Sequence, residues 1–97
     1  MSDEREALLS LVARARPLVA RLVAAAPDWN VVRSVQAQLT QIGADAEQAR
    51  RPSPEMLKRI NIGLYAVREF ETSDPELAEL LIEIANRYED WGNARHL

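Results

Sequence analysis

Prolines divide this chain into four stretches, each of which can form one helix. Four of the five prolines lie between segments of regular apolar spacing: Pro27, Pro52, Pro54 and Pro75. Proline has no backbone N–H and its ring collides with the preceding turn, so it is disfavoured inside a helix but tolerated in the first turn. We therefore expect helices near residues 3–25, 29–49, 54–71 and 74–91, joined by short connections.

The apolar residues of each stretch recur at spacings of three and four, which is typical of a helix with one buried face. Because short connections make sequential helices antiparallel neighbours, the sequence predicts an all-α fold, a compact antiparallel bundle of about four helices. A single domain over residues 1–97 is expected, with residues 92–97 as a frayed tail. The predicted core positions are Leu8, Val12, Ala15, Val19, Leu22, Ala26, Val32, Val35, Leu39, Ile42, Ala46, Ala49, Leu57, Ile60, Leu64, Val67, Leu77, Leu81, Ile84, Tyr88 and Trp91.

Three features leave alternatives open. Pro17 lies inside the first stretch, and because the apolar spacing keeps its phase across it, a kink is expected rather than a break. Gly43 in the second stretch indicates either the close approach of a neighbouring helix or an early end of its own helix. The last helix begins either with Ser73 as its cap or with Asp74, which Pro75 follows in the first turn.

The sequence contains no set of residues that would catalyse a reaction. There is no cysteine, and the one histidine, His96, lies next to the C-terminal residue without an orienting partner. A Gly-rich phosphate loop, a Ser/His/Asp set and a Glu–His pair at metal-binding spacing are also missing. We therefore expect no catalytic, cofactor-binding or metal-binding residue and no enzyme. Arginines inside the first apolar stretch argue against a signal peptide or a membrane span there, so a cytoplasmic location is expected.

Acidic residues gather toward the end of the chain. Residues 69–90 contain eight acidic side chains against one arginine, whereas residues 1–68 contain ten basic and seven acidic side chains. An acidic region repels nucleic acid and anionic lipid, and it steers a protein toward a cationic partner. A protein partner is therefore expected, and neither a nucleic acid nor a membrane.

Helical phase places three apolar residues on outward faces: Ile62 and Tyr65 in the third stretch and Ile82 in the fourth. An apolar spot inside an acidic rim is typical of a protein-binding surface. Singly exposed apolar residues are also common, and a homodimer closed by these faces is a further alternative to the favoured monomer. The predicted partner-binding residues are Ile62, Tyr65, Glu69, Glu71, Asp74, Glu76, Glu79, Ile82 and Glu83.

One part of the sequence resembles a known family. The segment LYAVREFETSDPELAEL, with LKRI just before it and QAQLTQI upstream, is similar to immunity proteins that accompany type VI secretion effectors with NAD(P)+-hydrolysing toxin domains. The similarity extends from about Leu18 to Ala85 in compatible order and spacing. Its most specific part is residues 66–71 followed by residues 73–77.

The resemblance implies a small helical bacterial protein that binds its cognate toxin domain in the cytoplasm and blocks its active site. An acidic, rigid surface agrees with this role, because a toxin that binds a dinucleotide needs positive charge around its phosphate pocket. One alternative is immunity to another nucleotide-consuming toxin, such as an ADP-ribosyltransferase or a nucleotide pyrophosphokinase. Another is a helical adaptor or self-assembling module without a toxin partner.

Overall fold

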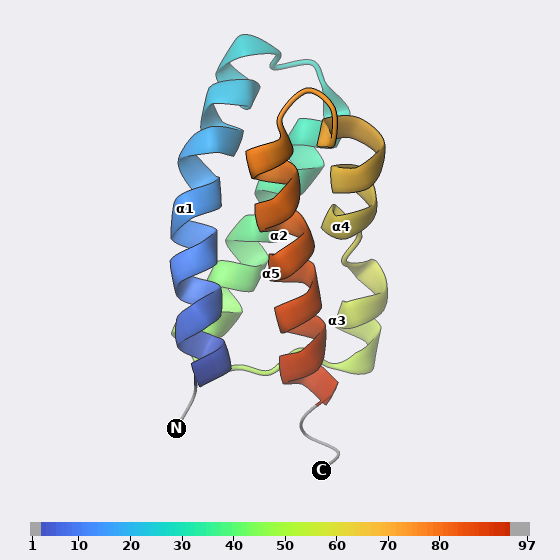
Figure 1. Cartoon of the computed structure of the whole chain (residues 1–97). Coiled ribbons are helices and arrows are strands. Elements are labelled where there is room, and N and C mark those ends of the chain that lie inside the picture. The colour runs from blue at the N-terminus through green and yellow to red at the C-terminus, as the bar shows by residue number, and fades with distance from the viewer. Residues whose placement is uncertain (1–2, 94–97) are drawn as a thin grey trace.

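Figure 1 shows a bundle of helices, with no strand in the part of the chain that this computed structural model describes, residues 3–93. Its elements are α1 (Asp3–Ala25), α2 (Asn30–Glu47), α3 (Pro54–Arg59), α4 (Ile62–Tyr65), the π-helical turn η1 (Ala66–Phe70) and α5 (Pro75–Asn93). The long helices α1, α2 and α5 run the length of the bundle, while α3, α4 and η1 follow one another in the fourth position. The expected all-α antiparallel bundle is confirmed.

The three long helices enclose the core with the faces that the apolar spacing predicts. α1 packs against both α2 and α5, and α5 also packs against α4 and η1. Burying these faces removes apolar surface from water, which supplies most of the free energy that holds such helices together. The buried residues on the three helices include Leu8, Val12, Ala15, Val19, Val32, Val35, Leu39, Ile42, Leu77, Leu81, Ile84, Tyr88 and Trp91.

Pro17 and Gly43 are both accommodated inside continuous helices. α1 runs through Pro17 without a break, and the proline side chain is exposed, so its ring displaces nothing in the core. A Cβ atom placed on Gly43 would meet Val12 Cγ1 at 3.4 Å, which shows how closely α1 and α2 approach. Because α2 continues to Glu47, the alternative of an early end at Gly43 is wrong.

The N-terminal ends of α3 and α5 use a polar cap followed by proline. The Ser53 hydroxyl accepts a hydrogen bond of 3.2 Å from the Met56 backbone N–H, and Pro54 is the first helical residue. Asp74 Oδ1 accepts one of 3.3 Å from the Leu77 N–H. The cap of α5 is therefore Asp74 and not Ser73.

The C-terminal end of α2 is a Schellman turn with alanine at the position where glycine is usual. The Ala49 N–H donates to the Ala46 carbonyl at 3.2 Å, and the Arg50 N–H donates to the Asp45 carbonyl at 2.8 Å. Ala49 has a φ of 54°, in the left-handed region that is unfavourable for a residue with a Cβ atom. Arg5 of α1 donates two further hydrogen bonds to carbonyls of this last turn.

The expected third helix is interrupted at Ile60 and Asn61. Asn61 has φ −135° and ψ 21°, outside the helical region, and its backbone N–H donates to Gln38 Oε1 of α2 at 2.9 Å. Gln38 Nε2 donates to Asn61 Oδ1 at 2.6 Å and to Ser34 Oγ at 3.1 Å. In a continuous helix the Asn61 N–H would bond to the Leu57 carbonyl, so the expected single helix over 54–71 is wrong.

The interruption changes which residues of this segment face the core. Ile62, Ala66 and Phe70 are fully or almost fully buried, at a spacing of four. Leu64 and Val67, which the uninterrupted spacing predicts in the core, are 54% and 50% exposed. The expectation was wrong for both residues, because the break after α3 and the wider turn of η1 rotate the faces of the segment.

α5 remains helical through Asn93, so the expected frayed tail does not begin at residue 92. Gly92 is buried against the connection between α2 and α3. A Cβ atom placed there would lie 2.9 Å from Pro52 Cγ and 3.2 Å from the Pro52 carbonyl oxygen. The rest of the expected tail, including His96, lies outside the described residues.

Candidate protein-binding surface

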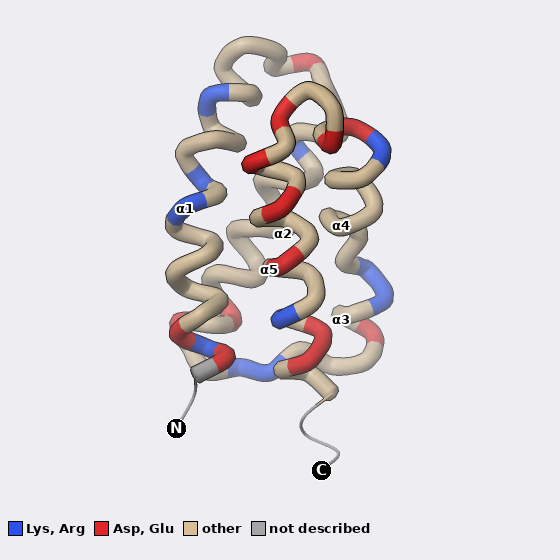
Figure 2. The backbone as a smooth tube through the Cα atoms, in the orientation of Figure 1, with Lys and Arg blue, Asp and Glu red and all other residues tan. Residues whose placement is uncertain are grey.

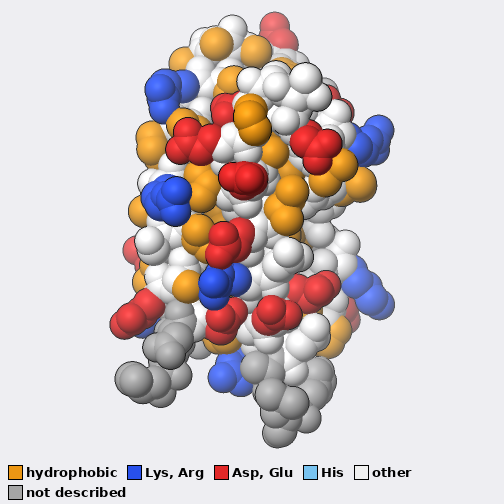
Figure 3. All heavy atoms as spheres, viewed as in Figure 1, with side chains coloured by type: hydrophobic (Ala, Val, Ile, Leu, Met, Phe, Trp, Pro, Cys, Tyr) orange, Lys and Arg blue, Asp and Glu red, His pale blue; other side chains and the backbone are white. Residues whose placement is uncertain are grey.

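The outer face of α5 and the turn before it carry a line of carboxylates. Figures 2 and 3 show acidic residues along α5 and around its connection to η1, on the face turned toward the viewer. We call the exposed members of this line the acidic strip: Glu71, Glu76, Glu79 and Glu83. All four belong to the predicted partner-binding residues, and the structure brings them to one side of the bundle.

One arginine neutralises the lower end of the acidic strip. Arg87 Nε lies 3.0 Å from Glu83 Oε2, and its Nη1 lies 3.0 Å from Glu4 Oε1 of α1. Within residues 3–93 no ion pair involves Glu71, Glu76 or Glu79. Within the acidic strip, the carboxylates without an ion-pair partner are therefore the three nearest the corner between η1 and α5.

The remaining predicted residues are less accessible than expected. Ile62 is fully buried, so the prediction that it faces outward is wrong, and the reason is the rotated face of α4. Tyr65 and Ile82 are half-buried and pack against the core. Glu69 and Asp74 are also half-buried, and the Asp74 carboxylate is already engaged in capping α5.

Leu64 and Val67 occupy the outward position that the sequence assigned to Ile62 and Tyr65. In the described part of the chain they are the exposed large hydrophobic residues. Figure 3 shows hydrophobic side chains over α4 and beside the acidic groups of α5. The signal available in the sequence was weak: Asn61 and Gly63 are poor helix formers at the point where the predicted helix is interrupted.

A groove of about 840 Å³ between α1 and α2 is lined by basic side chains, in contrast to the acidic strip. Arg16 and Arg33 line it from the two helices, together with polar groups of Asn30, Ser34 and Thr40. Neither arginine belongs to an ion pair within residues 3–93. This face would suit an acidic partner and not a cationic one.

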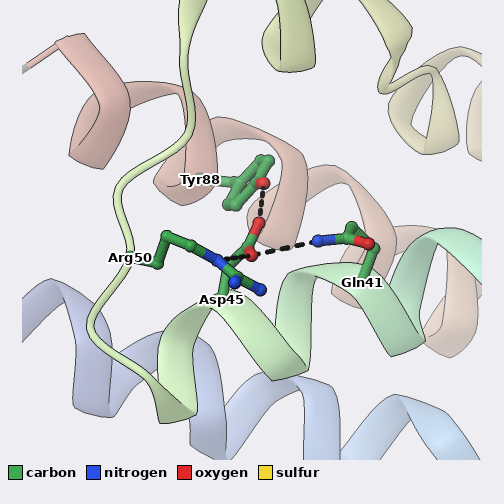
Figure 4. A network of polar contacts seen from close by, with 4 residues as sticks. All are labelled: Gln41, Asp45, Arg50 and Tyr88. Carbon is green, nitrogen blue, oxygen red and sulfur yellow. Dashed lines mark hydrogen bonds and ion pairs between the residues drawn. The ribbon is translucent and has the colours of Figure 1, made fainter.

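A buried polar network holds the lower half of the bundle together (Figure 4). Asp45 is 3% exposed, and its carboxylate accepts hydrogen bonds from Gln41 at 3.0 Å, Arg50 at 2.9 Å and the Tyr88 hydroxyl at 2.5 Å. Burial, and then the hydrogen bond to Asp45, raise the pKa of Tyr88 above its ordinary value. Asp45 is not part of the apolar spacing of α2, and it is buried nevertheless.

This network ties α2, the connection after it and α5 into one unit. With three donors on a carboxylate that solvent hardly reaches, Asp45 is a structural residue and not a group held ready for chemistry. Within residues 3–93 there is no group of three or more His, Cys, Asp and Glu residues that would hold a metal ion. The described helices also include none that is long and apolar enough to cross a membrane.

These features define a class: a small all-α bundle that carries a strip of exposed carboxylates on one side. The chain belongs to the Tsi6 family, whose match extends over residues 7–90. The resemblance to immunity proteins of type VI secretion effectors is thereby confirmed.

Two solved structures agree with this assignment. The structure of Tsi6 from Pseudomonas aeruginosa is 28% identical to this chain, with a TM-score of 0.73 over 84% of this chain and 93% of that one. A chain in the structure of Tse6 in complex with Tsi6 is 29% identical, with a TM-score of 0.76 over 93% of both chains. No curated protein matches the sequence.

Proposed function

We propose that this chain is an immunity protein that binds a cognate effector toxin of a type VI secretion system and neutralises it. The observation that carries this proposal is the family match over residues 7–90, together with the similar chain in the complex of Tse6 with Tsi6. Almost the whole described fold takes part in that similarity, so the proposal does not depend on one short motif.

The toxin we propose is an NAD(P)+ glycohydrolase, and the immunity protein occludes its active site. A pocket that holds the phosphates of a dinucleotide carries positive charge, and the acidic strip offers the complementary charge without being a substrate. The buried core and the hydrogen-bonded network around Asp45 make the bundle rigid. A rigid protein loses little conformational entropy on binding, which favours tight inhibition. An ADP-ribosyltransferase or a nucleotide pyrophosphokinase would need similar charge, so toxins of those classes are the second candidates.

In this proposal residues 1–97 act as one domain, in the cytoplasm, as a monomer until the toxin binds. The protein performs no turnover of its own. Its effect is stoichiometric, because each molecule would block one toxin domain.

The direct test is to induce the partner toxin domain in cells with and without this protein and to measure intracellular NAD+. We expect NAD+ to fall with the toxin alone and to be preserved when both are present. If this protein protects cells from a toxin that leaves NAD+ unchanged, the toxin is not an NAD(P)+ glycohydrolase. If NAD+ falls equally in both cultures and the purified proteins do not bind, the proposed function is wrong.

A further inference from the structure

The segment from Ile60 to Phe70 has the least regular backbone of the bundle, and hydrogen bonds from α2 hold its start in this conformation. Gln38 of α2 holds Asn61 out of the helical path with two hydrogen bonds, and η1 adds a π-helical turn directly after α4. A π-turn inside a helix is rare and is often associated with a functional site. Here it occurs in the segment that exposes two aliphatic side chains.

Leu64 and Val67 share the outer side of this segment, because residues three apart on a helix are neighbours. They are 54% and 50% exposed, whereas Ile62 and Ala66 beside them are fully buried. Turning the segment toward the predicted phase would bury two aliphatic side chains, Leu64 and Val67, and expose one, Ile62. The contacts with Gln38 therefore hold an arrangement in which aliphatic surface stays in water.

Helix geometry places Val67 on the side of the segment that faces α5, with Leu64 next to it. Gly63 packs against α5, since a Cβ atom placed on it would meet Ala85 Cβ at 3.4 Å. Val67 follows Gly63 by four residues and lies on the same side of the segment, one turn further along. Because α5 runs in the opposite direction, that turn lies beside the part of α5 that precedes Ala85, where Ile82 is half-buried next to Glu79 and Glu83.

We infer that Leu64 and Val67 are the apolar anchor of the toxin interface, seated in an apolar recess of the toxin whose rim is basic. The inference rests on the proposed function and specifies its contact surface. Binding energy in protein interfaces concentrates on a few residues near the centre, surrounded by contacts that contribute little energy but exclude water. Leu64 and Val67 supply such a centre, and the acidic strip supplies one side of the rim.

The test measures binding kinetics of the full chain against the purified toxin domain, with Leu64→Ala, Val67→Ala and the isosteric Val67→Thr. Since Leu64 and Val67 are half-exposed, all three variants should melt close to the wild type. We expect each to speed dissociation by roughly ten-fold or more, with little change in the association rate. Thr40→Ala on α2 is the matched control, because threonine has the shape of valine and Thr40 is exposed at the α1–α2 groove.

The possible results distinguish a wrong anchor from a wrong proposed function. If the wild type binds and the Leu64 and Val67 variants dissociate faster while Thr40→Ala does not, the anchor is established. If the wild type binds and protects cells, but the variants dissociate like the wild type, the anchor lies elsewhere and the proposed function stands. If the wild-type protein neither binds nor protects, the proposed function fails and this inference fails with it.

Discussion

The side-chain amide of Gln38 pairs with both the backbone and the side chain of Asn61, through hydrogen bonds of 2.9 Å and 2.6 Å. The two residues are 23 positions apart, on α2 and at the start of α4. This pairing satisfies a backbone N–H that would otherwise lose its partner where the helix is interrupted. It also sets the rotation of everything from Ile62 to Phe70.

Replacing Gln38 by alanine should therefore both destabilise the protein and disturb the outward surface of the segment from Ile62 to Phe70. Both hydrogen bonds are exposed, so water can replace them in part, and their loss should cost about 0.5–1.5 kcal/mol. Urea unfolding measures that cost, and toxin binding of the same variant measures the effect on the surface. Gln36→Ala is the control, because the exposed Gln36 side chain makes no hydrogen bond in the described structure. Equal unfolding midpoints for the two variants would show that the pairing contributes nothing.

The rotated face of α4 predicts an unequal pair of alanine substitutions. Ile62→Ala removes fully buried carbons and should cost about 2–5 kcal/mol. Leu64→Ala removes a half-exposed side chain and should change stability by less than about 1 kcal/mol. The uninterrupted phase predicts the opposite order. Chemical unfolding of the two variants side by side decides which face is inside.

Tyr88 should make the protein sensitive to alkali. Its pKa is raised in the folded state by burial and by the hydrogen bond to Asp45, so the folded protein holds the phenol proton more tightly than the unfolded chain. The stability from this interaction is complete below the unfolded pKa of about 10 and is lost as the pH rises toward the folded value. Urea unfolding between pH 8 and pH 11 should therefore show a decline that Tyr88→Phe reduces.

At neutral pH the same Tyr88→Phe substitution should cost about 1–2 kcal/mol, because the buried Asp45 carboxylate loses one of its donors. Tyr65→Phe is the control at neutral pH, since the Tyr65 hydroxyl makes no hydrogen bond within residues 3–93. If the Tyr88→Phe variant were as stable as the wild type, the network would not contribute to holding α5 against α2.

The alanine in the Schellman turn offers a stabilising substitution. Ala49→Gly should raise the unfolding free energy by about 0.5–1 kcal/mol, because glycine adopts a φ of 54° without the clash of a Cβ atom. Ala37→Gly, in the exposed middle of α2, should lower it by about 1 kcal/mol. Thermal melts of the two variants should shift in opposite directions. A loss of stability in Ala49→Gly would contradict the assigned turn.

Charge reversal on the acidic strip should slow encounter with the toxin. Glu76→Lys with Glu79→Lys changes two carboxylates that have no ion-pair partner in the described structure, so the fold should be unaffected. We expect the association rate at low salt to fall roughly ten-fold and to depend less on ionic strength. Glu6→Lys with Glu47→Lys makes the same change in net charge at exposed positions of α1 and α2. If both pairs slow association equally, net charge and not the strip guides the encounter.

The sequence was sufficient for most of the three long helices, because each keeps an apolar spacing that a buried face requires, although Ala49, expected in the core, is exposed beyond the end of α2. Val12, Ile42 and Leu81 are buried as their spacing predicts. It failed for the segment after Pro54, where a partner 23 residues away decides the path of the chain. A local pattern carries no information about such a partner, and the same limit hid the burial of Asp45, whose donor Tyr88 is 43 residues away.

The sequence likewise predicted one part of the candidate surface correctly and another part wrongly. Glu71, Glu76 and Glu79 are exposed as predicted, because charged side chains without a buried partner remain in water. Two of the three apolar members, Ile62 and Tyr65, depended on the phase of one interrupted segment, and there Ile62 exchanged its place with Leu64 and Val67.

The opposite faces of α4 and η1 have a consequence for how recognition can change. Ile62, Ala66 and Phe70 hold the segment in the bundle, and they share no face with Leu64 and Val67. A new side chain at either outward position alters the shape offered to a partner and leaves the packing of the bundle untouched. The segment can therefore acquire a different specificity by single substitutions, without an accompanying repair of its interior.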